Sequence, residues 1–108
     1  MFDRKPPIRS TQEDVAELAE EIDRFVVRLG ERIDSLQDAQ LAGAATEVSS
    51  LARQLSKEAE RLGYPSMALS AKGVAMAAED DIVEELKETI LELTEIAQRI
   101  RRGHRGAA

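Results

Sequence analysis

The chain has no cysteine and no tryptophan, and it has only one histidine and three prolines. Without cysteine it forms no disulfide, has no thiolate nucleophile and cannot bind a metal ion through sulfur. Aromatic residues make up 3% of the 108 residues. A hydrophobic core must therefore be built from aliphatic side chains, those of Leu, Ile, Val, Ala and Met.

Basic residues are outnumbered, 15 against 21 acidic ones, which gives a formal net charge of −6. This balance argues against nucleic-acid binding, because neutralising phosphates requires a basic surface, and it favours a partner with basic patches. No apolar run approaches the roughly 20 residues of a membrane span. The first ten residues also lack the apolar segment of a signal peptide. We therefore expect a cytoplasmic protein, with a bacterial-type cytoplasm as the default, and neither nucleic acid nor membrane as partner.

Ala, Leu, Glu, Arg and Lys are abundant in the sequence and favour helix throughout. The alternation typical of strands is almost absent, and a chain of this length has room for one core. We therefore expect one all-α domain over residues 10–102. Pro6 and Pro7 predict an extended arm over residues 1–9, and residues 103–108 are expected to form a flexible tail.

The first helical segment begins with Ser10 and Glu13, which have the spacing of a capping box. Apolar residues then recur at intervals of three and four, which is typical of one helix face packed on a core. Beyond Gly30 the pattern resumes one position out of register. The segment is therefore either one long helix kinked near Gly30 or two helices that meet there. The expected core positions are Val15, Leu18, Ile22, Phe25, Leu29, Ile33, Leu36 and Ala39.

A turn is expected at residues 41–44, before a second helix. Gly63 suits the left-handed position that ends a helix, and Pro65 suits the start of the next one. The second helix is expected to bury one face, formed by Val48, Leu51, Ala52, Leu55, Ala59 and Leu62.

The segment that follows Pro65 is rich in alanine and glycine, so we expect it to be enclosed by its neighbours. Gly73 weakens this helix by roughly 1 kcal/mol, which suggests a packing reason for it. Met67 and Met76 are expected to fill gaps in the core.

The last helix begins with a second possible capping box, Asp81 with Glu84, and ends at Gly103 after several arginines that complement the helix dipole. Four amphipathic segments joined by short turns predict an antiparallel four-helix bundle. The expected core face of the last helix consists of Val83, Leu86, Ile90, Leu93, Ala97 and Ile100.

Templates for catalysis and metal binding fail on this sequence. A carboxylate-bridged metal site in a bundle needs inward-facing Glu-x-x-His pairs, and the single histidine, His104, falls in the predicted tail. With nothing expected to order it, His104 is disfavoured as a metal ligand or phosphate carrier. No glycine-rich phosphate loop and no nucleophile with a base beside it is present. We expect no metal ion, no cofactor and no enzymatic activity.

The second helix has a polar outer strip opposite its apolar face. Arg53 should point almost directly away from the core, at about 100° per residue. An ordinary solvated helix face and a partner-binding surface both explain such a strip. Its residues are Thr46, Ser49, Arg53, Ser56, Lys57 and Glu60.

The stretch LARQLSKEAERLGYPSMALSA resembles the central helix pair of histidine phosphotransfer (Hpt) domains, the four-helix carriers of bacterial phosphorelays. The family motif is His-x-Leu-Lys-Gly on an amphipathic helix, followed some six residues later by a glycine. Leu55 falls on the motif's Leu and Gly63 on that glycine. FVVRLGERIDSLQDAQLAG is similar to the preceding helix of the family, with Gly30 in place of a proline. The resemblance covers residues 25–102.

The differences from the family fall on its chemistry. Arg53 stands at the position of the phosphorylatable histidine, Ser56 at that of the Lys and Lys57 at that of the Gly. A guanidinium stays protonated and cannot act as the phosphate-accepting nucleophile. The resemblance therefore implies a pseudo-Hpt module that binds a receiver or histidine-kinase domain without carrying phosphate. The outer strip would be its contact surface, with Gly63 and Pro65 in structural roles.

Two alternatives remain open. One is a helical interaction or structural module with an unrelated partner, which could self-associate. A phosphotransfer protein that uses His104 is the other alternative. The sequence does not specify an oligomeric state.

Overall fold

The computed structural model describes residues 5–104, and over that range its only regular secondary structure is helix, without strands. A short 3-10 helix, η1 (Ala16–Leu18), leads into α1 (Ala19–Leu41). Three further helices follow, α2 (Ala45–Arg61), α3 (Pro65–Glu79) and α4 (Val83–Gly103). The predicted all-α chain with four helices is thus confirmed. None of the helices within the described range is both long and apolar enough to span a membrane.

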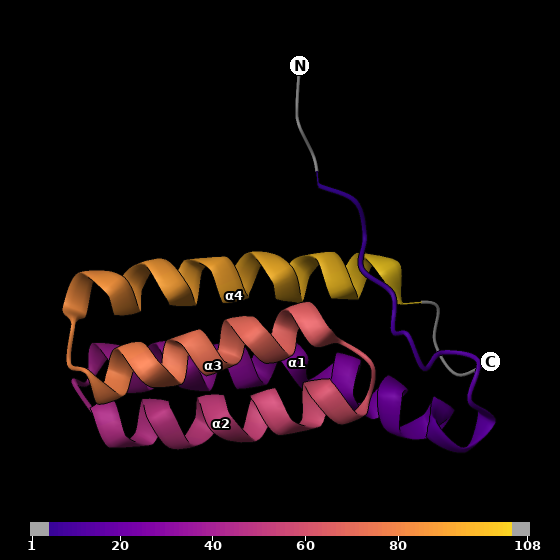
Figure 1. The fold of residues 1–108 in the computed structure, drawn as a ribbon, viewed down its shortest axis with the longest axis horizontal. Coiled ribbons are helices and arrows are strands. Elements are labelled where there is room, and N and C mark those ends of the chain that lie inside the picture. The colour runs from indigo at the N-terminus through magenta and orange to yellow at the C-terminus, as the bar shows by residue number, and fades with distance from the viewer. Residues whose placement is uncertain (1–4, 105–108) are drawn as a thin grey trace.

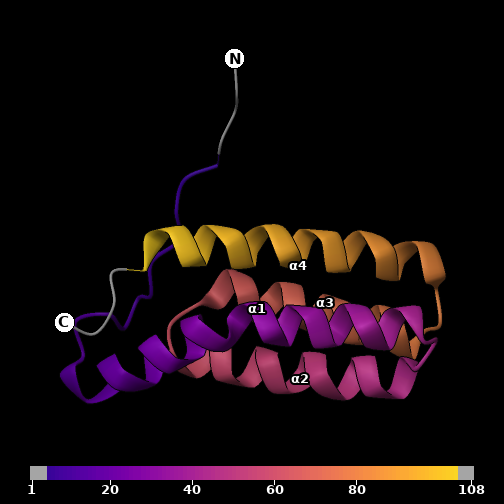
Figure 2. The ribbon, with the colours of Figure 1, turned by 180° about the vertical axis from the view of Figure 1, so that it is seen from behind.

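The four helices surround one aliphatic core. Helices α2 and α3 lie side by side along their length, and the chain turns back at the end of each helix (Figures 1 and 2). Helix α1 contacts α2 and α4, and α3 contacts the same two helices from the other side. Each helix contributes fully buried residues at its predicted apolar positions, as Leu29, Leu55, Met67 and Leu93 show. This burial of the apolar faces is what holds the helices together.

Helix α1 passes through Gly30 without a break, so the one-helix alternative holds. A Cβ atom built on Gly30 would lie 3.5 Å from Nη1 of Arg101, which places the Arg101 side chain over this position. Glycine inside a helix costs roughly 1 kcal/mol, which the packing of a 23-residue helix readily offsets. The shift in the apolar pattern therefore does not mark a helix end.

All three turns between helices have the same hydrogen-bond pattern. After α2, Tyr64 N–H donates to the carbonyl of Ala59 and Gly63 N–H donates to that of Glu60. This is the Schellman motif, which requires a left-handed residue just beyond the helix. The left-handed residues are Gly43 (φ 70°) after α1, Gly63 (φ 86°) after α2 and Asp81 (φ 57°) after α3.

Neither predicted capping box forms. Helical conformation begins at Ala16 rather than beside Ser10, and the N-cap of α4 is Ile82, with no side-chain cap. The buried Ser10 hydroxyl donates to the carbonyl of Leu62 at 2.5 Å and accepts from Gln12 N–H at 2.9 Å. Asp81 closes α3 instead of opening α4. Both predicted caps were wrong, because Ser10 binds the Leu62 carbonyl and Asp81 ends α3.

The segment before η1 packs across one end of the helices. Ile8 N–H donates to the carbonyl of Arg99, and Thr11 N–H donates to that of Gly63. Gly63 and Gly103 leave room for this segment, since a Cβ on Gly63 would lie 2.6 Å from Ser10 Oγ and one on Gly103 would meet the Ile8 carbonyl. The part of the predicted arm before residue 5 lies outside the described residues.

The end of the chain differs from the predicted tail at its first two residues. Gly103 belongs to α4 and is buried, and His104 is half-buried with Nε2 2.9 Å from Asp23 Oδ1. The expectation that nothing orders His104 was therefore wrong, because α1 supplies a carboxylate 81 positions away. Residues 105–108 of the predicted tail lie outside the described residues.

Three predictions about packing were also wrong. Val83 is 60% exposed as the first residue of α4, directly after the turn at Asp81 and Ile82. Met76 is 49% exposed on the outer face of α3, whereas Met67 is buried as expected. Gly73 has no close neighbour, since the nearest atom to a Cβ there would be Thr89 Cγ2 at 3.9 Å. A methyl group fits at Gly73, so packing does not explain this glycine.

Candidate functional site

The outer strip of α2 is exposed at four of its six predicted positions. Thr46, Arg53, Lys57 and Glu60 are exposed, while Ser49 and Ser56 are half-buried. The buried face of α2 packs Val48, Ala52, Leu55 and Ala59 into the core, which directs the strip outward. Helix periodicity alone accounts for this placement.

Arg53 is held by a carboxylate from the next helix. Its Nε lies 2.7 Å from Oε2 of Glu79, and its Nη2 lies 2.6 Å from Oε1 of the same residue. Ser49 Oγ donates to Oε2 of Glu79 as well. These neighbours, Arg53 first and then Ser49, lower the pKa of Glu79 to about 2, and the pair raises the pKa of Arg53. Arg53 is thus an ion-paired residue at an accessible surface.

Ser56 serves the packing of α2 on α3. Its hydroxyl donates to the backbone carbonyl of Ala68 at 2.7 Å. This bond satisfies a polar group between two closely packed helices. Ser56 therefore lies at the margin of the strip, with its hydroxyl turned toward α3 and not toward solvent.

The strip continues onto the outer face of α3. Leu69 is 73% exposed, and Met76 lies about two helical turns further along the same face. Lys57 on α2 and Lys72 on α3 are exposed, and within residues 5–104 neither forms an ion pair. We call this surface the α2–α3 face. It consists of Arg53, Lys57, Leu69, Lys72, Met76 and Glu79.

Glu79, Leu69 and Lys72 were not singled out from the sequence. Glu79 is 26 positions from Arg53 and joins it only because α3 runs back along α2. Leu69 is exposed, whereas most apolar residues of α3 are buried. Because α3 contains so many apolar residues, the sequence does not distinguish this exposed leucine from the buried ones. Gly63 adopts the left-handed conformation and Pro65 is the first residue of α3, where the sequence places them.

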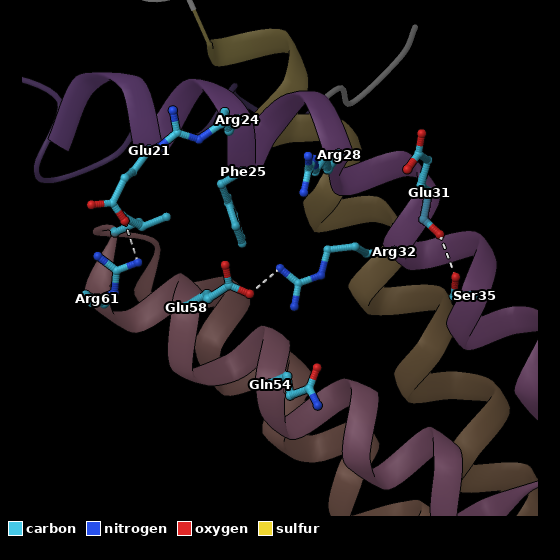
Figure 3. Close-up of a pocket in the computed structure, with 11 residues that line it drawn as sticks. Glu21, Arg24, Phe25, Arg28, Glu31, Arg32, Ser35, Gln54, Glu58 and Arg61 are labelled. Atoms are coloured by element: carbon cyan, nitrogen blue, oxygen red, sulfur yellow. Dashed lines mark hydrogen bonds and ion pairs between the residues drawn. The ribbon is translucent and has the colours of Figure 1, made fainter.

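A second polar region lies between α1 and α2 and was not anticipated. It is a groove of about 470 Å³ with four arginines and three glutamates around it (Figure 3). Arg61 pairs with Glu21 at 2.7 Å, and Arg32 pairs with Glu58 at 2.5 Å. Arg32 also lies over the ring of Phe25, with its Cζ 5.8 Å from the ring centroid. A cation held over an aromatic ring gains further stabilisation.

Within residues 5–104, no group of three or more His, Cys, Asp or Glu side chains could hold a metal ion. His104 and Asp23 are paired, but among the described residues they are not part of a group of three potential metal ligands.

Comparison of the chain with protein-family models, curated proteins and solved structures gave no match. Functional inference therefore depends on the residues and geometry described above.

Proposed function

We propose that this chain is a signalling interaction module in the bacterial cytoplasm. It would be an antiparallel four-helix bundle of the Hpt type that binds a receiver or histidine-kinase domain without carrying phosphate. The α2–α3 face would be the contact surface. The observation that carries the proposal is the exposure of Arg53, the residue that the sequence resemblance aligns with the reactive histidine of Hpt domains.

The chemistry of the α2–α3 face supports binding rather than transfer. Arg53 stays protonated, and its pairing with Glu79 raises its pKa further, so it cannot accept a phosphoryl group as a nucleophile. Two exposed apolar side chains surround the pair, together with two lysines that form no ion pair with the described residues. Aliphatic contact area ringed by cations suits an acidic partner surface.

A partner with clustered carboxylates would compete with Glu79 for Arg53. Bidentate pairing with a carboxylate is the preferred geometry of a guanidinium, so an Asp-rich pocket offers Arg53 an equivalent bond. Lys57 and Lys72 would supply the additional attraction. Thr46, Ser49 and Glu60 border the same surface.

The direct test is binding of purified receiver and histidine-kinase domains from the source organism. A Lys57→Ala, Lys72→Ala variant should bind at least about tenfold more weakly, because two charge interactions across the interface are lost. Lys87→Ala, on the exposed side of α4, is the matched control and should bind like the wild type. Equal binding by the wild type and the double variant would exclude the α2–α3 face.

Introducing the residues of the Hpt motif tests whether the α2–α3 face descends from a phosphotransfer site. An Arg53→His, Ser56→Lys, Lys57→Gly variant has the family's residues, but the Ser56 change breaks the bond to the Ala68 carbonyl. Arg53→His with Lys57→Gly keeps that bond and should be compared with it. Gain of acid-labile phosphate from a phosphorylated receiver in either variant would support descent from a working Hpt site.

The same incubation tests His104. Its Nε2 is engaged with Asp23, so the wild-type chain should acquire no phosphate. Phosphate on His104 would contradict the proposed function.

A second candidate is a structural or interaction module that forms homodimers. The observation in its favour is exposed apolar area at the turns that precede α2 and α4, where Leu41, Ile82 and Val83 are 85%, 46% and 60% exposed. Sedimentation of the purified chain separates the two candidates. A stable dimer with no affinity for receiver or kinase domains would favour this second function.

A further inference from the structure

The groove between α1 and α2 concentrates cations on an acidic protein. Helix α1 contributes three of the arginines and α2 contributes the fourth. Buried Phe25 and Leu62 form the apolar floor, and the other nine lining residues are polar or charged. Its volume of about 470 Å³ falls in the range of small-molecule sites, roughly 300 to 1,000 Å³. The four arginines of the groove are Arg24, Arg28, Arg32 and Arg61.

Two of these arginines are not occupied by the carboxylates of the groove. Arg28 forms no ion pair or hydrogen bond with any of residues 5–104, and it lines the groove from the α1 side (Figure 3). Arg24 makes only a 3.9 Å contact with Glu20, a residue outside the groove. The Glu21–Arg61 and Glu58–Arg32 pairs already neutralise the other two. Glu31 is the third carboxylate of the groove, so four arginines against three glutamates leave one net positive charge, on the α1 side.

The spacing of these cations favours an anion with more than one charged group. Arg24, Arg28 and Arg32 are four residues apart, which places successive side chains about 6 Å apart along the helix. Guanidinium groups bind phosphate and carboxylate through two parallel hydrogen bonds. Gln54, across the groove on α2, adds a neutral amide donor.

We infer that the groove between α1 and α2 is a binding site for a small multivalent oxyanion, held chiefly by Arg28 with Arg24 and Arg32. Phosphate and carboxylate share this chemistry, and the groove would accept a ligand of either kind. The site is on the opposite flank of α2 from Glu79 and does not depend on the proposed signalling function.

Calorimetric titration of the full chain at low ionic strength tests the inference, with inorganic pyrophosphate in one series and citrate in another. The wild type should bind at least one of these probes, and the series that gives the tighter binding identifies the preferred oxyanion. Arg28→Ala should weaken binding at least about tenfold, because charge-assisted hydrogen bonds are lost. Arg28 has no ion-pair or hydrogen-bond partner among residues 5–104, so this variant should melt like the wild type.

Two further variants separate a specific site from a general effect of charge. Glu58→Gln should bind the probe more tightly, because it frees the Arg32 guanidinium from a competing carboxylate. Lys87→Ala, which removes one cation from the exposed side of α4, away from the groove, should leave binding unchanged. No heat with either probe at millimolar concentration, or equal weakening by Arg28→Ala and Lys87→Ala, would overturn the inference.

Discussion

Arg53 on α2 and Glu79 on α3 form a two-point ion pair, with 2.7 Å between Nε and Oε2 and 2.6 Å between Nη2 and Oε1. The pair joins two helices across their exposed margin and orients Arg53 along the surface. Any acidic partner that engages Arg53 must therefore replace an existing bond. This relationship makes Glu79 a determinant of both stability and binding.

The Arg53–Glu79 pair should make stability depend on acid pH. The pKa of Glu79 is about 2 in the folded chain, against an ordinary value of 4.5. Because the folded pKa is depressed, the contribution is fully present above pH 4.5 and is lost as the pH falls toward 2. Thermal melts of wild type and Glu79→Gln should differ near pH 6 and converge near pH 2.

Glu88→Gln is the control for this experiment, since Glu88 is exposed on α4 and has no ion pair within residues 5–104. Its melting temperature should follow the wild type at every pH. A gap between wild type and Glu79→Gln that does not narrow on acidification would contradict the prediction.

Gly63 and Gly43 offer a matched comparison of two left-handed glycines. Alanine at Gly43 should cost only the left-handed backbone penalty, about 1 kcal/mol, because nothing lies within 4 Å of its Cβ position. Alanine at Gly63 must also displace Ser10 and the backbone of Gln12, 2.6 Å and 2.7 Å from that position. Its cost should reach about 3 kcal/mol, as in other overpacked sites.

Urea denaturation of the two glycine variants measures this difference. Similar losses would show that the segment around Ser10 does not pack against Gly63 in solution. Ser10→Ala leaves the buried Leu62 carbonyl without its donor and should fall between them, at about 2 kcal/mol.

Asp81 is a non-glycine residue in a position that favours glycine. Its φ of 57° closes the Schellman motif after α3, so Asp81→Gly should stabilise the protein by about 0.5 to 1 kcal/mol. Asp80→Gly is the control, since Asp80 has an ordinary φ of −82° and glycine there brings no relief. A melting temperature raised by Asp81→Gly and not by Asp80→Gly is the expected result. Equal effects of the two substitutions would disprove the backbone explanation.

Tyr64 should ionise far above its ordinary range. It is 1% exposed and its ring stacks on Phe25 with centroids 5.8 Å apart. Burial first, and the charge of Glu13 second, raise the pKa of Tyr64 from 10 to about 12. Because the folded pKa is raised, its contribution to stability is fully present below pH 10 and is lost as the pH rises toward 12.

The chain has one tyrosine, so its ultraviolet absorbance at alkaline pH reports Tyr64 alone. The titration midpoint should lie near 12 in the folded chain and near 10 in urea. Tyr64→Phe should flatten the loss of stability between these values. A midpoint near 10 without denaturant would show that the ring is accessible to solvent.

The helices could be predicted from the sequence because their causes are local. An apolar residue at every third or fourth position predicts a buried helix face, and Gly43, Gly63 and Pro65 mark turns by their own backbone preferences. The exposure of Arg53 follows from the same periodicity. These features need no knowledge of neighbouring elements.

The capping residues were not predictable in this way. Ser10 has the composition of a helix cap, but its hydroxyl binds the Leu62 carbonyl 52 positions away. A serine hydroxyl can bind the backbone near it in the sequence or a distant group that folding brings close. The sequence shows only the first of these two possibilities.

The sequence by itself determined which segments are helical, which faces they bury and that Arg53 is exposed. Only the tertiary structure decided what the polar side chains contact. The Arg53–Glu79 and His104–Asp23 pairs, 26 and 81 positions apart, form because the folded chain brings their helices together. Helical periodicity depends on neighbours one turn away, whereas an ion pair depends on the path of the whole chain.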